Sequence, residues 1–258
     1  MARPNLIQIP GTILWARYSF SPNRFKYCGP DKNLELFEYT SQKKTDGGLT
    51  QILASFEAAF PYIEFIAHEN KIEDAFDSRA VEAYWLGNDL LNHINFGKFY
   101  RHMEERYLKR SRSKSSFEKA VENIPHGAKP HHSFHVLEIF RKIGSLRGIN
   151  HGPVLDTINN CLVEWGQVIK VEGQFLEVEY RPIIISDNQL VFASAQTKKI
   201  EYEFRGKSFF DNPRIGDWVS IHWNWACDIL TARQLQNLQK WTLWHLSLAN
   251  KKFSAPSR

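Results

Sequence analysis

The sequence predicts an α+β protein, in which a helical N-terminal domain precedes a small OB-like β-barrel that carries a C-terminal helix. Up to about residue 155, apolar residues recur every three or four positions, which is the period of an α-helix. After residue 160 the period becomes two, as in β-strands, and the last periodic segment is helical again. We therefore expect a helical domain with a His-rich segment over residues 1–155 and a barrel with its helix over residues 156–258.

The helical elements follow from two periodic segments and one aromatic segment. LTQILASFEAAFPYIEFIAHE (49–69) predicts one continuous helix, and DSRAVEAYWLGNDLLNHI (77–94) predicts a second helix with Asp77 as its N-cap. The aromatic-rich segment RYSFSPNRFKYCGP (17–30) has no such period. We interpret it as an ordered loop.

The strands are short and separated by turn residues. The turn sequences DN, RG and DNPRIGD divide alternating segments, which are FLEVEY (175–180), QLVFA (189–193), KIEYEF (199–204) and DWVSIHW (217–223). Together with the strand expected behind Cys161, these make five short strands, which at this spacing predict a small barrel or sandwich. The closing segment TARQLQNLQKWTLWHLSLAN places its large apolar residues largely on one helical side behind a Thr231 cap, which predicts a terminal amphipathic helix.

The excess positive charge of the chain lies in one segment. The net charge is +5, and residues 97–120 carry eight Lys or Arg against three Glu, so this one segment accounts for the whole excess. We interpret it as a solvated helix end and loop, and docking to an acidic partner or to RNA is the alternative.

The chain has neither a signal-peptide pattern nor an apolar run of membrane-spanning length, so we expect a cytoplasmic protein without a membrane partner. Three widely spaced cysteines, Cys28, Cys161 and Cys227, predict free thiols.

The second half contains a recognisable series of motifs. CLVEWGQVIKVEG (161–173) is followed some forty residues later by RIGDWVSIHWNWA (214–226) and then by the terminal helix. In this order, over about residues 160–245, the segments resemble the HypC/HupF family of [NiFe]-hydrogenase maturation chaperones. The resemblance implies an OB-type barrel with a trailing helix.

The same resemblance implies roles for two residues. The opening cysteine of those chaperones corresponds to Cys161, and it is the thiolate that engages the Fe(CN)2CO fragment and the immature hydrogenase large subunit. The histidine that ends the later strand corresponds to His222, as a second ligand or a hydrogen-bond partner. A soft thiolate suits iron with strong-field ligands. Here Cys161 follows a whole domain and so lacks a free α-amine; the alternative for both residues is a structural, buried role.

A further resemblance covers the whole chain. The segments SFSPNRFKYCGP, EAYWLGN and PHGAKPHHSFHV are similar to those of an uncharacterised bacterial family of the same length, commonly encoded beside [NiFe]-hydrogenase genes. This context agrees with the interpretation of the second half.

The helical half offers a second candidate site. If Pro130 begins a helix, His131 and His135 lie on one side of it while His132 points away, and two imidazoles at this spacing can share a metal. Glu57, Glu64 and His68 have helical spacing on the first predicted helix, and carboxylates and imidazoles inside a bundle build iron sites. The candidate iron ligands are therefore His131, His132, His135, Glu57, Glu64 and His68. Backbone-bound histidines and a solvated carboxylate face are the structural alternative.

These observations favour an accessory, chaperone-like protein of [NiFe]-hydrogenase maturation over an enzyme. It would bind an iron fragment or the large-subunit precursor through Cys161, and its partners would be the hydrogenase large subunit or other maturation proteins. One alternative is a non-heme iron enzyme that uses His131 and His135. Another is nucleic-acid binding through the barrel and the basic segment 97–120, which we do not favour because the strands are not rich in Lys or Arg.

Overall fold

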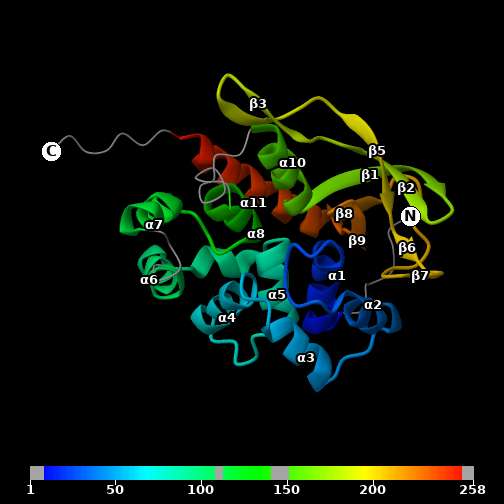
Figure 1. The fold of residues 1–258 in the computed structure, drawn as a ribbon, viewed down its shortest axis with the longest axis horizontal. Helices are drawn as coiled ribbons and strands as arrows, with labels where there is room; N and C mark the ends of the chain where they lie inside the picture. Colours follow the sequence, from blue (N-terminus) through cyan, green and yellow to red (C-terminus); the bar gives the residue numbers. More distant parts are fainter. Residues whose placement is uncertain (1–8, 108–112, 141–150, 252–258) are drawn as a thin grey trace.

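The computed structural model describes residues 9–107, 113–140 and 151–251, and its N-terminal half is helical while its C-terminal half is rich in strands (Figure 1). The α+β prediction is confirmed: a closed barrel follows the helices, and one long helix ends the described chain. The helical elements are α1 Gly11–Arg24, α2 Asn33–Gln42, α3 Gly47–Ala54, α4 Phe60–Glu69, α5 Ser78–Trp85, the 3₁₀ helix η1 Asp89–His93, α6 Phe96–Tyr107, α7 Lys114–Val121, α8 His132–Phe134, the π-helical η3 His135–Phe140, α10 His151–Cys161 and α11 Ala232–Asn250.

Helix α1 occupies part of the segment that was expected to be a loop, and that expectation is wrong for residues 17–24. The helix has no clear amphipathic period because it is buried on every side: it packs against α5 in the helical half and against β8 and β9 of the barrel. Pro22 lies in its last turn, where a missing backbone N–H disrupts few helical bonds. The aromatic residues of this segment are therefore core residues.

The single helix expected over residues 49–69 is two helices. Helix α3 ends at Ala54 and α4 begins at Phe60, with a turn between them. Pro61 stands in the first turn of α4, where proline is favoured because the N–H that it lacks would have no partner inside the helix. The next predicted helix has the expected Asp77 N-cap, whose carboxylate accepts the N–H of Arg79, but it ends at Trp85.

Five strands close the barrel in the order β1-β2-β5-β9-β8, as expected for an OB-type barrel. They are β1 Glu164–Glu172, β2 Phe175–Tyr180, β5 Gln196–Glu201, β8 Trp218–His222 and β9 Trp225–Ile229. All neighbouring pairs are antiparallel except β5 and β9, and β1 pairs with β8 to complete the ring. Two hairpins lie outside the ring, formed by β3 Ile183–Ser186 with β4 Gln189–Phe192 and by β6 Glu203–Phe204 with β7 Lys207–Ser208.

Helix α11 begins where the sequence predicts. The Thr231 hydroxyl accepts the N–H of Gln234, and the Gln234 side chain accepts the N–H of Thr231, which together form a capping box. Nineteen residues of helix follow, and the face with Leu238, Trp241 and Leu248 is buried. The terminal amphipathic helix is thereby confirmed.

One hydrophobic core extends through both halves of the chain. Phe20 of α1 packs edge-on against Trp225 of β9, with ring centroids 5.0 Å apart, and Phe37 of α2 lies 5.6 Å from Phe209. The expected boundary at residues 155/156 falls inside α10. The helices and the barrel therefore share their interior.

Across the described ranges, none of the helices combines the length and the apolar character needed to cross a lipid bilayer.

Candidate functional site

Cys161 lies where the helical half joins the barrel. It is the last residue of α10, and β1 begins three residues later at Glu164. All three cysteines are free; Cys161 and Cys28 are half-buried, whereas Cys227 is fully buried. Cys161 therefore has both a fixed backbone and partial access to solvent.

Two imidazoles from different halves of the chain meet at the backbone of Cys161. The Nε2 atom of His132 donates to the Cys161 carbonyl over 2.8 Å, and the ring of His222 lies beside the ring of His132 and near the Cys161 backbone. The two rings are 5.2 Å apart and nearly perpendicular. The residues expected to belong to two separate sites, one helical and one in the barrel, thus form a single cluster that contains Cys161, His132 and His222.

The hydrogen bond that fixes the His222 ring depends on a proline in α1. In an uninterrupted helix the carbonyl of Tyr18 would accept the N–H of residue 22, but Pro22 has none. The Nδ1 atom of His222 donates to that carbonyl instead, at 2.6 Å. His132 is fixed in a similar way, because the Tyr84 hydroxyl lies 3.2 Å from its Nδ1.

Burial makes this cluster electrically neutral. It lowers the pKa of His222 to about 4 and holds the pKa of His132 well below its ordinary value. Burial also raises the pKa of Cys161 to about 12, and the nearby Trp223 side chain offsets this only in part. Near neutral pH the cluster consists of two neutral imidazoles and a protonated thiol, which forms a thiolate only if a ligand replaces its proton.

Aromatic side chains cover the thiol side of the cluster. Trp223 has a positive φ of 52°, unusual for a large side chain, in the turn between β8 and β9. Its ring stacks on Tyr27 at 4.0 Å and lies 6.0 Å from Phe25. Tyr27 is 62% exposed and Phe25 is 50% exposed. The α1–α2 connection thus reaches Cys161, and Cys28 within it lies close enough for its charge to raise the pKa of Cys161.

His131 and His135, the other two histidines predicted as ligands in the helical half, contact different partners. His131 lies outside the helix as the N-cap of α8, because the helix begins two residues later than expected, and its Nδ1 accepts the N–H of Ser133 at 3.1 Å. The Ser133 hydroxyl bridges His131 and His245 of α11, at 2.7 Å from each ring. His135 instead lies 3.4 Å from the Tyr62 hydroxyl. The expected pairing of His131 with His135 is therefore wrong.

Proton positions in this serine bridge follow from its backbone donors. The Nε2 atom of His245 accepts the N–H of Lys129 at 3.0 Å, so its Nδ1 carries the proton and donates to Ser133. Burial lowers the pKa of His131 to about 3 and that of His245 well below its usual value. The bridge is a neutral structural chain that ties α8 to α11.

The expected carboxylate and histidine set of the first helix does not converge. Glu57 lies in the turn between α3 and α4, so its spacing to Glu64 is no longer helical. Glu64 pairs with Arg106 at 2.9 Å, and the His68 side chain is 81% exposed. The prediction that these residues project together into the bundle is wrong, because the helix breaks before Pro61 and because Glu64 and His68 lie on the solvent-facing side of α4.

Nowhere in residues 9–107, 113–140 and 151–251 do three or more His, Cys, Asp or Glu side chains come together in a way that could hold a metal ion. His131 and His135 do not share a ligand position, and His131 already accepts two hydrogen bonds at Nδ1. The residues present in the helical half therefore do not fit the iron centre expected there.

The basic segment 97–120 is partly described, since residues 108–112 lie outside the described ranges. Lys98 pairs with Glu69 at 3.0 Å, and Arg106 pairs with Glu64. Lys114 lies 3.9 Å from Glu118 on the exposed side of α7. These contacts agree with a solvated helix surface.

Comparison with known proteins places the chain in a family. The model of DUF6390, described as a family of unknown function, matches residues 7–256. The chain belongs to this family. No curated protein and no solved structure matches it.

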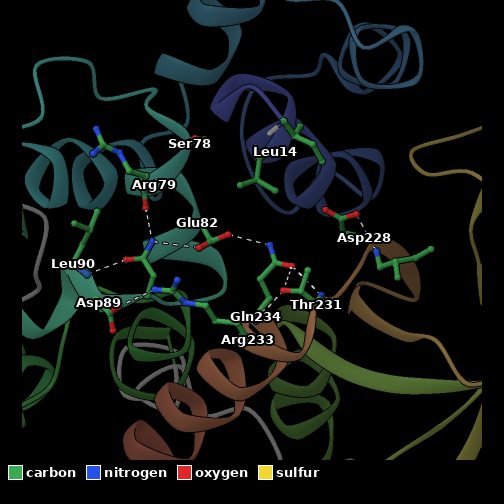
Figure 2. A pocket seen from close by; sticks show the side chains of 13 residues that line it. Leu14, Ser78, Arg79, Glu82, Asp89, Leu90, Asp228, Thr231, Arg233 and Gln234 are labelled. Carbon is green, nitrogen blue, oxygen red and sulfur yellow. Dashed lines mark hydrogen bonds and ion pairs between the residues drawn. The ribbon is translucent and has the colours of Figure 1, made fainter. Parts of the chain in front are cut away.

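This member of the DUF6390 family also has a cavity, which the sequence did not predict. A cavity of about 500 Å³ lies between α5, η1, the end of β9 and the start of α11 (Figure 2). Gln234 of α11 donates to Glu82 of α5 at 3.0 Å, and Arg233 pairs with Asp89 at 2.8 Å. The capping motif predicted the start of α11 but carried no information about its partners in α5. Of the other charged side chains along this cavity, Arg79 pairs with Asp77 and Asp228 pairs with Arg17.

Proposed function

We propose that this protein is an accessory protein of [NiFe]-hydrogenase maturation that binds the large-subunit precursor through the surface around Cys161. The observation that carries the proposal is the position of Cys161, whose carbonyl is held by His132, with the His222 ring packed against His132, beside exposed aromatic side chains. This cysteine has a fixed backbone, and its side chain packs against a small hydrophobic cluster while it remains partly accessible to solvent. The closed barrel with a trailing helix, and the motif positions in it, support the same proposal.

His222 acts in this proposal as a hydrogen-bond partner rather than as an iron ligand. Its Nδ1 proton is committed to the Tyr18 carbonyl, and the ring also faces the backbone of Cys161. Together with His132 it keeps the end of α10 in place while the Cys161 thiol binds its partner. The two histidines are therefore positioning residues for Cys161.

The exposed aromatic rings supply the contact area for a client protein. Phe25 and Tyr27 are half or more exposed, and Tyr27 rests on Trp223 next to the thiol. Aromatic side chains are enriched where protein interfaces gain most of their binding free energy. Replacement of Tyr27 by alanine should thus weaken client binding even though the thiol is unchanged.

Binding of an iron fragment as cargo would use the same sulfur atom. The thiol is protonated near neutral pH, so the iron–sulfur bond forms as the thiol proton leaves to solvent. Cargo binding should therefore release one proton per iron and strengthen as the pH rises.

The test is a binding measurement with the purified large-subunit precursor by biolayer interferometry, comparing the wild type with Cys161→Ser. We expect the variant to lose at least about tenfold in affinity, which corresponds to about 1.4 kcal/mol. Cys28→Ser is the matched control, because this thiol is also half-buried, has a raised pKa and lies nearby. Equal affinities of the wild type and both variants would refute the role of Cys161, and no binding by the wild type would refute the proposed partner.

A further inference from the structure

A groove on the outer side of α11 is built from two segments that lie far apart in the sequence. Its floor is formed by Trp241, Leu243 and Trp244, and its wall by the chain from Gly127 to Lys129. The volume is about 580 Å³. Leu243 is 50% exposed and Trp244 is 38% exposed, so large apolar surfaces face solvent here.

The shape of the groove is fixed by a specific contact. The indole N–H of Trp244 donates to the carbonyl of Gly127 at 3.0 Å. Gly127 has a φ of +99°, and a Cβ atom at this position would lie 3.2 Å from the Trp244 ring. Only glycine meets both conditions easily, so the wall and the floor are held in register.

The rim of the groove is positively charged. The ammonium group of Lys240 lies 4.6 Å from the Trp241 ring centroid, and that of Lys251 lies 5.6 Å from the Trp244 ring centroid. Lys129 donates to the Ile94 carbonyl, and burial lowers its pKa. Among the described residues none of these three lysines forms an ion pair, and no acidic side chain lines the groove. The surface therefore combines an apolar floor with uncompensated positive charge.

We propose that this groove binds an acidic peptide segment of a partner protein, with one large apolar side chain on the tryptophan floor and carboxylates at Lys240 and Lys251. Charge complementarity selects this occupant, because a basic or purely apolar segment would leave the lysines unpaired. A concave apolar floor accommodates a side chain, whereas single-stranded RNA needs a basic groove that follows its backbone over several nucleotides. The surface uses none of the residues around Cys161, so it is a second and independent contact.

The first experiment selects peptides from a random display library against the full-length protein. We expect enriched sequences to combine Asp or Glu with Phe, Trp, Leu or Ile. The best peptide is then synthesised with a fluorophore, and its dissociation constant is measured by anisotropy. Enrichment of basic sequences, or of none, would overturn the proposal.

The second experiment uses variants of the groove with that same peptide. Lys240→Glu/Lys251→Glu should weaken binding by about tenfold or more, and Leu243→Ser by about fivefold. Lys44→Glu/Lys71→Glu changes the net charge equally at exposed positions elsewhere and should leave the affinity unchanged. Circular dichroism melting confirms that each variant is folded, and both Leu243 and the two lysines are exposed enough for substitution.

Two outcomes of these measurements would replace the proposal. An equal loss in both double variants would mean that general charge attraction, not the groove, holds the peptide. Displacement of the peptide by oligouridylate at a similar concentration, lost in Lys240→Glu/Lys251→Glu, would assign the groove to nucleic acid.

Discussion

Two regions of the molecule have similar residue types and opposite structural outcomes. The junction cluster, defined as Cys161, His132 and His222, is assembled from residues far apart in the sequence and is largely buried. The α4 surface, defined as Glu64 and His68, has its residues four positions apart and faces solvent. The difference shows that burial by a second structural element, and not spacing along one helix, brings chemically useful groups together in this protein.

The largest contrast should be in thiol reactivity at the junction. A pKa of about 12 leaves Cys161 with on the order of a thousandfold less thiolate than an ordinary cysteine at about pH 8. Alkylation by iodoacetamide, followed by peptide mass spectrometry, should therefore be slower by about that factor in the folded protein than in guanidinium chloride. A native rate within about tenfold of the denatured rate would show that the junction is open, like the α4 surface.

The second largest difference should be in stability, because a substitution in the junction cluster should lower the free energy of unfolding more than one on the α4 surface. His132→Ala removes a ring packed 4.6 Å from Trp85 and leaves the Cys161 carbonyl without its donor. We expect a loss of about 2–4 kcal/mol in the free energy of unfolding, measured in urea. A loss below about 1 kcal/mol would mean that the junction holds a water-filled or adaptable site.

Acid should unfold the protein through its buried histidines. The pKa values of His135 and His222 are lowered to about 4 by burial, whereas an unfolded histidine titrates near 6.5. The unfolded chain therefore binds protons first as the pH falls, so stability present above about pH 6.5 is lost down to about pH 4, by about 1 kcal/mol per pH unit for each histidine. Urea midpoints across this range test the slope. His222→Gln should reduce it.

The smallest effects should come from the α4 surface. Glu64→Gln removes an exposed ion pair with Arg106, and His68→Ala removes a side chain that is 81% exposed. Each change should alter the free energy of unfolding by less than about 0.5 kcal/mol. A loss comparable with that of His132→Ala would imply that the α4 surface is covered by a partner in solution.

The sequence predicted those parts of the fold that depend on local pattern. Alternating segments identified β2, β8 and the end of β5 in the ring, and the Thr231 motif located the start of α11. The segment 189–193 forms β4 outside the ring, and β9 was not expected. Helix α1 was missed because an element buried on all sides has no apolar face, and because Pro22 argues against a helix. Pro61 could have indicated the break between α3 and α4, since proline favours a first helical turn.

The candidate site was predictable only in part. The motif series singled out Cys161 and His222, and the clustering of histidines drew attention to His132. Their meeting depends on how α8 lies against α10 and β8, which no local pattern contains. The same limit applies to the anchor at Tyr18, which requires α1 to pass beside β8.

The burial of α1 determines how the chain must unfold and how it can be divided. Thirteen of its fourteen residues are buried, and its Arg17 pairs with Asp228 of β9 at 2.6 Å. Separation of the helices from the barrel would expose this ion pair together with the Phe20 and Trp225 rings. We therefore expect a fragment that starts at residue 156 to expose apolar surface of the barrel to solvent, and the intact chain to melt in one cooperative transition.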